Sequence, residues 1–416
     1  MLDLSQLKYR FRIMDEKGTQ YNIEDFVDDL GWEEPEKEIA TRISFSTKND
    51  STSIGVLSSV IKLGSLVAIY ASCGAAKSEE EVARGYIIDW NPRLALSSNA
   101  FLGKCYDELY NLQESQDNIY FSDGTGTKTI VTSILKSWSV PMGEYKGPDK
   151  QHAKLAYKSQ ALSSIILDVL DDAYKKGGSK CLLYARKGKT YVKPYGTNDE
   201  VYVLDVDNII SINHKRSTSG MVTRVKVIGQ ADDDGRTAVV ETLNGKTKYG
   251  IRQKIVTQAK DDKQNQAHTD AQTILDENGD IVETVEVAAP DVPFVHKGDM
   301  IYCKAGTISG FYVILGVSHD IARRRMTLSL HTPYKDGDES SNSSSNKSYS
   351  VGQVVNFHGG KDWVASTSSS PARTDLGAGP AKIGYTNPGS AHPYCLITQD
   401  WAKTQVWGWV DAGSFD

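Results

Sequence analysis

Alternating apolar and polar positions dominate this chain and predict a mainly β protein. Runs rich in β-branched and aromatic residues, separated by turn-forming residues, are typical of strands. In the N-terminal part the expected strands are residues 7–14, 40–46, 66–72, 84–90 and 93–102. In the later part they are residues 201–204, 209–215, 222–228, 237–242, 300–304, 310–318 and 325–330. Residues 28–38 are acidic and contain Pro35, so we expect a surface loop there.

A helical period replaces the alternation between residues 111 and 200. One apolar stripe predicts a helix over residues 160–175 that ends at Gly177 and Gly178. The stripe consists of Leu162, Ile165, Ile166, Val169, Leu170 and Ala173. A shorter helix is expected to begin at Thr127, which can cap it, and to end before Pro141. Residues 181–186 and 190–195 predict a hairpin, so this stretch reads as an α+β insert.

The two β parts share a short pattern. Lys62-Leu63-Gly64-Ser65 precedes a β-rich run, and a second run begins at Gly85. His296-Lys297-Gly298-Asp299 likewise precedes a β-rich run, and a second run begins at Gly310. The echo suggests a body built twice on one plan. Chance is the alternative, because a glycine turn before a strand is common in β proteins.

Composition divides the chain into five parts. Residues 1–110 form a first β domain, 111–200 the α+β insertion domain, and 201–335 a second β domain that also holds a helix over 262–278. Residues 336–350 are rich in Ser and Asn and cannot build a core, so we expect a flexible linker. Residues 351–416 are dense in Gly, Trp and short strand signals, which indicates a small β-barrel of SH3-like size.

Charge and cysteine content narrow the class of protein. The formal net charge of −6 argues against a protein that coats nucleic acid. No apolar run is long enough to span a membrane, and the N-terminus lacks the apolar core of a signal peptide. The five cysteines lack CxxC spacing and read as buried free thiols of a reducing compartment. We therefore expect synthesis in a cytoplasm.

Several residues invite a chemical interpretation. His358, His392 and Cys395 could be imagined as metal ligands or as a peptidase dyad, but the spacing is not that of a zinc site. The acidic groups 79–81, 171–172, 232–234 and 261–262 could supply carboxylates for glycoside hydrolysis. They fall in loops or at helix ends, which favours solvated surface, with the lining of a channel as the second interpretation.

Three further motifs also have simpler structural explanations. Residues 124–129 resemble a phosphate loop but lack its full spacing. Residues 323–325 form a basic cluster, most simply a turn before a strand, or else a contact to an acidic neighbouring subunit. Trp363, Trp401, Trp407 and Trp409 could stack on sugars, although at least two should belong to the core of so small a unit. We therefore assign no catalytic, cofactor-binding or metal-binding residues.

The order of several segments resembles the XkdQ/YqbQ family of prophage tail proteins, the baseplate hubs of contractile tails and R-type bacteriocins. The resembling segments are residues 106–112, 115–118, 143–145, 152–158, 221–229 and 249–253. The last part is similar to the SH3-like domain found on such hubs, through residues 354–360, 378–383, 392–394 and 408–411. The family often has His where this chain has Cys395, which weakens any metal site built on that position.

The resemblance implies two tube-like β-barrel domains per chain and a homotrimer that forms a ring of six similar modules. Such a ring would join the hexameric tail tube protein to the trimeric central spike protein and would touch baseplate wedge proteins. It implies no enzyme activity, no cofactor, no membrane partner and no specific nucleic acid binding. The chain would be made in the bacterial cytoplasm and become part of the particle baseplate.

Two other functions stay open. A cell-wall-binding adaptor or peptidoglycan hydrolase component of the tail tip is suggested by the tryptophans of residues 351–416. A tail tip protein of a non-contractile phage would share the fold, and the sequence hardly separates it from the hub.

Overall fold

The chain is described here from a computed structural model, which covers residues 2–15, 17–95, 98–231, 235–258, 264–334, 349, 351–387, 390–411 and 413–415. It divides into two compact units, Met1–Glu339 and Ser340–Asp416. Each unit is described by itself.

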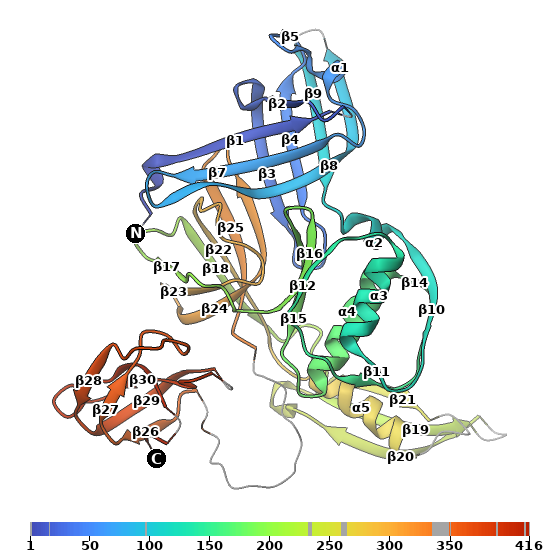
Figure 1. The fold of residues 1–416 in the computed structure, drawn as a ribbon. Coiled ribbons are helices and arrows are strands. Elements are labelled where there is room, and N and C mark those ends of the chain that lie inside the picture. The colour runs from blue at the N-terminus through green and yellow to red at the C-terminus, as the bar shows by residue number, and fades with distance from the viewer. Residues whose placement is uncertain are drawn as a thin grey trace. The chain divides into compact units, whose positions relative to one another are not determined.

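A mixed sheet of 13 strands runs through the described part of the first unit and contains two β modules (Figure 1). The first module consists of β1 (Leu7–Met14), β3 (Val27–Glu34), β4 (Arg42–Lys48), β7 (Leu66–Cys73), β8 (Lys77–Ala95) and β9 (Ser98–Tyr106), with β2 (Gln20–Asn22) at its margin. The second module consists of β17 (Tyr202–Asp205), β18 (Ser211–Ser217), β22 (Val282–Pro290), β23 (Met300–Ala305), β24 (Ile308–Asp320) and β25 (Arg325–His331).

The two modules have the same strand order. Numbered along the chain from one to six, the strands of each module pair in the order one, four, five, six, three, two. The modules differ at the first strand, because β1 is antiparallel to β7 whereas β17 is parallel to β23. The plan built twice, which the sequence echo suggested, is confirmed in the topology.

Glycine turns set the start of the same hairpin in both modules. Gly64 has φ of +80° and its N–H donates to the carbonyl of Ile87 over 2.8 Å. Gly298 has φ of +86° and its N–H donates to the carbonyl of Ile314, also over 2.8 Å. A β-bulge follows Ile87 and Ile314 alike. These two isoleucines are therefore equivalent, and the expected match between Gly85 and Gly310 is wrong by two residues.

Strand β3 joins the modules, so the predicted acidic loop is wrong for residues 28–34, whereas residues 35–38 do lie in the connection to β4. β3 pairs with β4 on one side and with β24 on the other. Leu30, Trp32 and Glu34 are buried at alternate positions, while Asp28 and Asp29 are exposed. Apolar and polar positions alternate with a period of two among the acidic residues. This alternation is a stronger sign of a strand than acidic composition is of a loop. Strand β22 was not predicted either.

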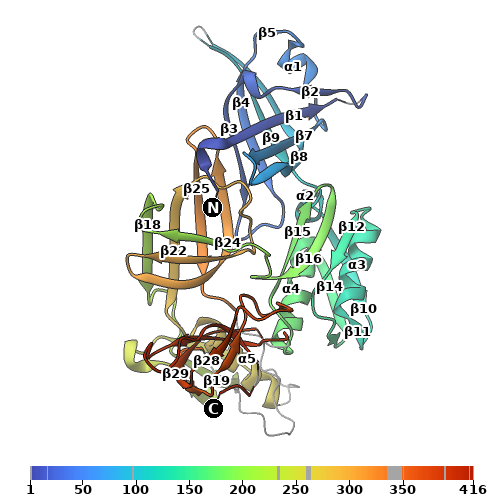
Figure 2. The ribbon, with the colours of Figure 1, turned by 60° about the vertical axis from the view of Figure 1, so that its left-hand side comes forward.

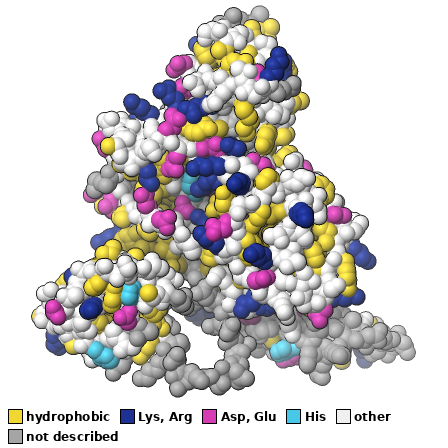
Figure 3. Space-filling model, viewed as in Figure 1, with side chains coloured by type: hydrophobic (Ala, Val, Ile, Leu, Met, Phe, Trp, Pro, Cys, Tyr) yellow, Lys and Arg dark blue, Asp and Glu magenta, His cyan; other side chains and the backbone are white. Residues whose placement is uncertain are grey.

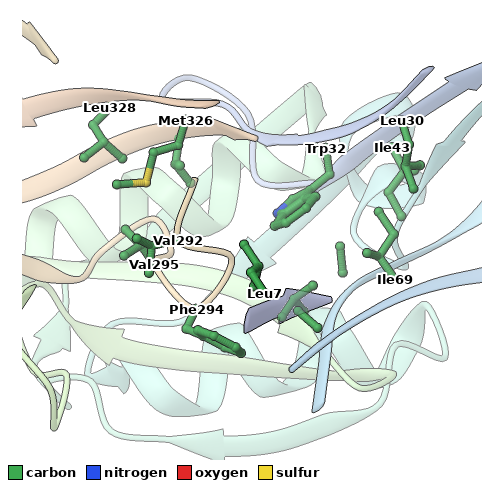
Figure 4. Packing of buried hydrophobic residues seen from close by; sticks show 14 of the residues in the cluster. Leu7, Leu30, Trp32, Ile43, Ile69, Val292, Phe294, Val295, Met326 and Leu328 are labelled. Carbon is green, nitrogen blue, oxygen red and sulfur yellow. The ribbon is translucent and has the colours of Figure 1, made fainter. Parts of the chain in front are cut away.

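Apolar residues of both modules form one core. Figure 4 shows Leu30, Trp32, Ile43 and Ile69 in the same packed cluster as Val292, Val295, Met326 and Leu328. These side chains come from strands of the first module and from the second module. Burial of shared apolar surface therefore holds the modules together.

The insert after the first module is α+β, as predicted. Its helices are α2 (Tyr110–Glu114), α3 (Thr127–Ser137) and α4 (Leu162–Lys175), and its strands are β10 (Gln116–Phe121), β11 (Thr125–Gly126), β12 (Met142–Tyr145), β13 (Gln151–His152), β14 (Leu155–Ala161), β15 (Cys181–Arg186) and β16 (Lys189–Pro194). Helices α3 and α4 lie side by side, and α4 packs against β15 (Figure 2). All six residues of the predicted stripe on α4 are buried. The hairpin β15–β16 is also confirmed.

A second insertion interrupts the second module between β18 and β22. It holds β19 (Arg224–Ala231), β20 (Thr237–Asn244), β21 (Gln253–Thr257) and α5 (Gln264–Asn278). The strands form a separate sheet, with α5 on one face (Figure 1). The predicted strands 222–228 and 237–242 therefore form a sheet of their own with β21 and do not extend the 13-stranded sheet. The remaining short elements are η1 (Leu4–Gln6), η2 (Glu24–Phe26), β5 (Ser51–Thr52), β6 (Gly55–Val56), α1 (Leu57–Val60) and η3 (Thr247–Tyr249).

The second unit is a small β structure. Strands β26 (Val354–Phe357), β29 (Gly379–Thr386), β30 (Tyr394–Thr398) and β31 (Trp407–Val410) form one sheet, and β27 (Gly360–Asp362) pairs with β28 (Arg373–Leu376). Its core includes Phe357, Ile383, Leu396, Val410 and Phe415. The predicted linker 336–350 lies outside the described residues except for Tyr349. Among the described helices, none has both the length and the apolar character needed to span a bilayer.

The two glycine turns give a matched pair of variants. We expect Gly64→Ala to lower the free energy of unfolding by about 1 kcal/mol, because alanine is strained at this φ and nothing lies within 4 Å of the added Cβ. We expect Gly298→Ala to cost about 2 to 4 kcal/mol, because its Cβ would also lie 2.6 Å from Cδ1 of the buried Leu182. Denaturant unfolding of both variants tests this, and equal losses would contradict it.

Candidate assembly site

A buried polar network lies where β3 meets β24. Trp32 on β3 stacks on His319 on β24, with ring centroids 4.0 Å apart and planes 13° apart. Nδ1 of His319 lies 2.6 Å from Oδ1 of Asp291, and Nε2 lies 3.1 Å from the carbonyl oxygen of Val295. The hydroxyl of Tyr9 on β1 donates to the other oxygen of Asp291. The network thus links three segments of the sheet.

The hydrogen-bond partners of His319 constrain its ring. Both ring nitrogens of His319 face oxygen atoms, so the ring is held from two sides. Asp291 lies at one of these sides and the backbone of Val295 at the other. Neither side chain has exposed surface, so loss of either partner would leave a buried group uncompensated. Burial also raises the pKa of Tyr9 far above its usual range, with the Asp291 carboxylate adding to the effect.

A second buried pair lies at the glycine turn of the second module. Nδ1 of His296 lies 2.7 Å from Oε1 of Glu34, the last residue of β3, and the other Glu34 oxygen accepts the backbone N–H of Lys297. Burial alone would raise the pKa of Glu34, but His296 outweighs it and brings that pKa to about 2. Burial and Arg186 lower the pKa of His296. The pair thus keeps the Glu34 carboxylate ionised at neutral pH.

Lys297 ties the same turn to the connection between β3 and β4. Its ammonium donates to the carbonyl oxygens of Pro35, Glu36 and Glu38 over 2.6, 3.2 and 2.8 Å. Burial lowers the pKa of Lys297 to about 8, so the group still carries a charge at neutral pH. The glycine turn of the second module is therefore hydrogen-bonded to the segment that connects β3 and β4 in the first module.

The insert also contacts this turn. Nζ of Lys193 on β16 donates to Asp299 over 3.0 Å, and the N–H of Gly196 donates to the carbonyl of Gly298 over 2.7 Å. At the other end of the insert, Asp107 accepts the N–H groups of Thr41 and Leu109. Burial raises the pKa of Asp107 to about 7. The insert is therefore anchored to the modules at both of its ends.

Residues 124–129 contribute to a triad-like group that sequence reasoning missed. Oγ1 of Thr127 lies 2.7 Å from Nε2 of His152, whose Nδ1 lies 2.6 Å from Asp172. Thr127 and His152 are buried, and the Thr127 hydroxyl also contacts the carbonyl of Lys150. A nucleophile needs access to its substrate, so we interpret this group as a structural link. Thr127 is not the helix cap we expected: the N-cap is Gly126, and Asp149 accepts the N–H of Lys128.

His392 and Cys395 do not form a dyad. Nδ1 of His392 lies 2.5 Å from Asp411, Nε2 faces the carbonyl of Ser368, and the ring stacks on Trp363. Burial raises the pKa of the Cys395 thiol to about 11, which disfavours the reactive thiolate. His358 lies on an exposed segment. Within the described ranges no three His, Cys, Asp or Glu side chains are grouped as a metal site would require.

The two acidic groups that the structure describes, 79–81 and 171–172, lie on different elements, β8 and α4, and contain ion-paired residues. Glu79 pairs with Arg12, and Asp171 pairs with Lys175 and Lys180. Glu81 corrects the expectation of a solvated surface, because it is buried and forms a two-pronged ion pair with Arg84. Residues 232–234 and 261–262 lie outside the described residues.

The basic cluster and the cysteines agree with their structural interpretations. Residues 323–325 span the turn into β25, where Arg323 pairs with Asp320. None of the five cysteines, all of which lie in the described ranges, forms a disulfide; Cys395 is half-buried, and the other four are buried.

The expectation that at least two of the four tryptophans belong to the core of the second unit is met only in part. Trp363 is buried and Trp409 is half-buried, whereas Trp401 and Trp407 are 58% and 56% exposed. The exposed pair is nearly parallel, with centroids 5.9 Å apart and planes 17° apart. The pair lines a groove of about 680 Å³ together with Trp363, Val364, Ala372 and Arg373. Asp362 neutralises the Arg373 guanidinium from below.

Most of the chain shares its fold with solved tail proteins. The structure of the prophage MuSo2 43 kDa tail protein from Shewanella oneidensis aligns with a TM-score of 0.58 at 12% identity, over 78% of this chain and 98% of that one. The tail protein from Neisseria meningitidis MC58 aligns with a TM-score of 0.55 at 12% identity, over 77% of this chain and 96% of that one. At such identities the likeness establishes a shared fold.

Sequence comparison gives the family. The model of the YqbQ-like family matches residues 30–332, so the chain belongs to the YqbQ-like family. The phage-like element PBSX protein XkdQ of Bacillus subtilis strain 168 is 26% identical over 226 residues, 54% of this chain and 68% of XkdQ. The protein YqbQ of the same strain is 25% identical over 228 residues, with the same coverage. The match ends before the second unit begins, so residues 340–416 are not covered by it.

Two histidine variants test the buried network. We expect His319→Ala to lower the free energy of unfolding by about 3 to 5 kcal/mol, because it leaves Asp291 buried without its partner. His268→Ala is the matched control, since its pair with Glu241 is exposed, and we expect a change within about 0.5 kcal/mol. Denaturant unfolding measures both, and a His319→Ala loss as small as the control would refute the importance of the network.

Proposed function

We propose that this chain is a structural baseplate hub of a contractile injection particle, either a phage tail or an R-type bacteriocin. The observation that carries the proposal is the pair of modules with one strand order in a single chain. Membership in the YqbQ-like family and the fold shared with tail proteins support a structural tail component. Three chains would then present six similar modules.

The proposed ring would reconcile two symmetries. A hexameric tail tube needs six equivalent contacts, whereas a trimeric central spike needs three, and a trimer of a duplicated chain offers both. Wedge proteins of the baseplate would meet the outer surface. Positive and negative side chains are interspersed on the face shown in Figure 3, and the net charge is −6. Such a surface suits a channel that does not retain DNA.

The domain boundaries stay part of the proposal. We assign residues 1–110 and 201–335 to the two tube-like domains and 111–200 to the insertion domain. We assign 336–350 to the linker and 351–416 to an SH3-like barrel. In this function the chain has no catalysis of its own. It would be made in the bacterial cytoplasm and act in the particle.

Mass measurement tests the trimer. We expect native mass spectrometry and light scattering of the full chain, alone or mixed with its spike protein, to give a species with three copies of the chain. The physical reason is that one duplicated chain offers two of the six positions in a sixfold ring. A species with any other copy number, both alone and with the spike, would rule out this hub.

The exposed tryptophan pair supports a second function, a cell-wall-binding adaptor or peptidoglycan hydrolase component. Trp401 and Trp407 form a flat aromatic platform, and aromatic residues of this kind are frequent in binding surfaces.

Sedimentation with purified peptidoglycan separates the two functions. If the adaptor function is correct, the full chain cosediments, and Trp401→Ala or Trp407→Ala weakens binding about tenfold. Trp138→Ala, on the exposed end of α3, is the control and should bind like the unchanged chain. Release of muropeptides would indicate the hydrolase. A chain that stays in the supernatant without releasing muropeptides excludes this second function.

A further inference from the structure

We propose that copies of this chain join by adding strand β18 of one chain to the open edge of β8 in the next. The inference rests on the proposed trimer and identifies the surface that would build it. Its template is a contact within the chain itself, the pairing of β3 with β24.

In the template, two strands pair one after the other along the same edge of β24. β25 pairs along one edge of β24, from Val313 to Asp320. Along the other edge β23 pairs with residues 308–313, and beyond them β3 pairs with residues 317–320. The strand that completes this edge therefore comes from the other module.

The same edge of β8 is open. β9 pairs with β8 from Tyr86 to Ala95, and β7 pairs with the other edge as far as Tyr86. Beyond the turn contact at Ile87, no strand of the described chain pairs with this edge. We call residues 88–95 the open edge. Among the described strands, none pairs with β8 at the place where β3 pairs with β24.

Matched β-bulges align the two edges residue by residue. The bulge follows Ile87 in β8 and Ile314 in β24, so Trp90 is equivalent to Val317 and Leu94 to Ile321. Val317 is 3% exposed, but Trp90 is 38% exposed. Ile321 packs against the core, whereas Leu94 is 84% exposed. Apolar side chains at this edge are covered by β3 in the second module but remain exposed in the first module. Exposed apolar side chains grouped in this way are typical of an interaction surface.

Strand β18 is the counterpart of β3. It pairs with β22 as β3 pairs with β4, and through these ladders His214 is equivalent to Trp32 and Lys215 to Glu33. Within the described residues, β22 is its one strand partner. The exposed Ile210, 54% accessible, lies just before β18. Each chain therefore offers one donor strand and one receptor edge, which fits a second copy of itself.

The register that follows from the template brings no like charges face to face. Lys215 lies opposite Asn91, and Arg93 lies opposite Asn213. Arg216 lies opposite Trp90, where a guanidinium can stack on the indole. Pro92, the counterpart of His319, supplies no N–H, so the open edge donates one hydrogen bond fewer to any added strand, β18 included. The contact is head to tail. Around a closed ring of three chains, the β18–β8 contact between chains would alternate with the β3–β24 pairing within each chain.

Two matched surface variants test the interface through the mass of the assembly. Leu94→Asp places a charge on the open edge, and we expect the trimer dissociation constant to rise about tenfold or more. Val364→Asp is the control: Val364 is 81% exposed, lies in the second unit, and should leave the trimer unchanged. Thermal unfolding of both variants at low protein concentration checks that each still folds.

Cysteine pairing tests the register itself. Asn91→Cys combined with Lys215→Cys should form disulfide-linked dimers and trimers under mild oxidation, because their template counterparts Ser318 and Glu33 are paired. Lys8→Cys combined with Lys215→Cys is the control and should not. A trimer that neither crosslinks nor responds to Leu94→Asp overturns the interface and leaves the hub standing. A chain that never forms a trimer overturns both.

Discussion

The pairing of β3 with β24 is the constraint on which the rest of the first unit depends. It merges two modules into one ladder, so the modules cannot rotate against each other without breaking backbone hydrogen bonds. The side chains along this seam are polar as well as buried. A buried polar network is costly unless every partner is in place, and so it favours one arrangement over slightly rotated ones. Trp32, His319 and Asp291 supply that selectivity.

The same three-residue device recurs in the second unit. There Trp363 stacks on His392, Nδ1 of His392 faces Asp411, and Nε2 faces a backbone carbonyl. In both places an imidazole is held between an indole face, a carboxylate and a main-chain oxygen. A flat ring that can donate on two sides joins strands where an apolar side chain could only pack. The resemblance is one of chemistry, since the two units have different sheets.

Local structure could be predicted from the sequence better than the pairing of segments that are far apart in the chain. The stripe on α4 and the hairpin β15–β16 follow from spacing alone, and the glycine turns revealed the duplication. Strand β3 was missed because acidic residues occupy its solvent side, although Leu30 and Trp32 kept a period of two. The second insertion was missed because its strands alternate like those of the module it interrupts.

The candidate assembly site could not have been predicted in the same way. Glu34 and His296 are 262 residues apart, and Tyr9 and Asp291 are 282 apart, so neither pair leaves a local spacing. A histidine or aspartate gives no sign of its partner until the sheet order is known. The alternation through Glu34 was the one available clue, because it placed a carboxylate on the buried side of a strand. Such a carboxylate needs a partner, which the sequence alone does not identify.

Duplication followed by divergence explains why the edges of β8 and β24, which are equivalent in the two modules, are paired differently. The edge of β24 in the second module is completed by β3 of the first module, whereas no strand in the described part of the chain completes the edge of β8 beyond Ile87. An open apolar edge is a hazard, because it invites pairing with any extended chain. Pro92 reduces that hazard without removing it, since Trp90 and Leu94 remain uncovered. Among the described strands of one chain, the strand β18 and the edge of β8 therefore each lack a further strand partner. In the proposed head-to-tail ring each donor strand would meet a receptor edge, and three copies of a two-module chain would give sixfold repetition.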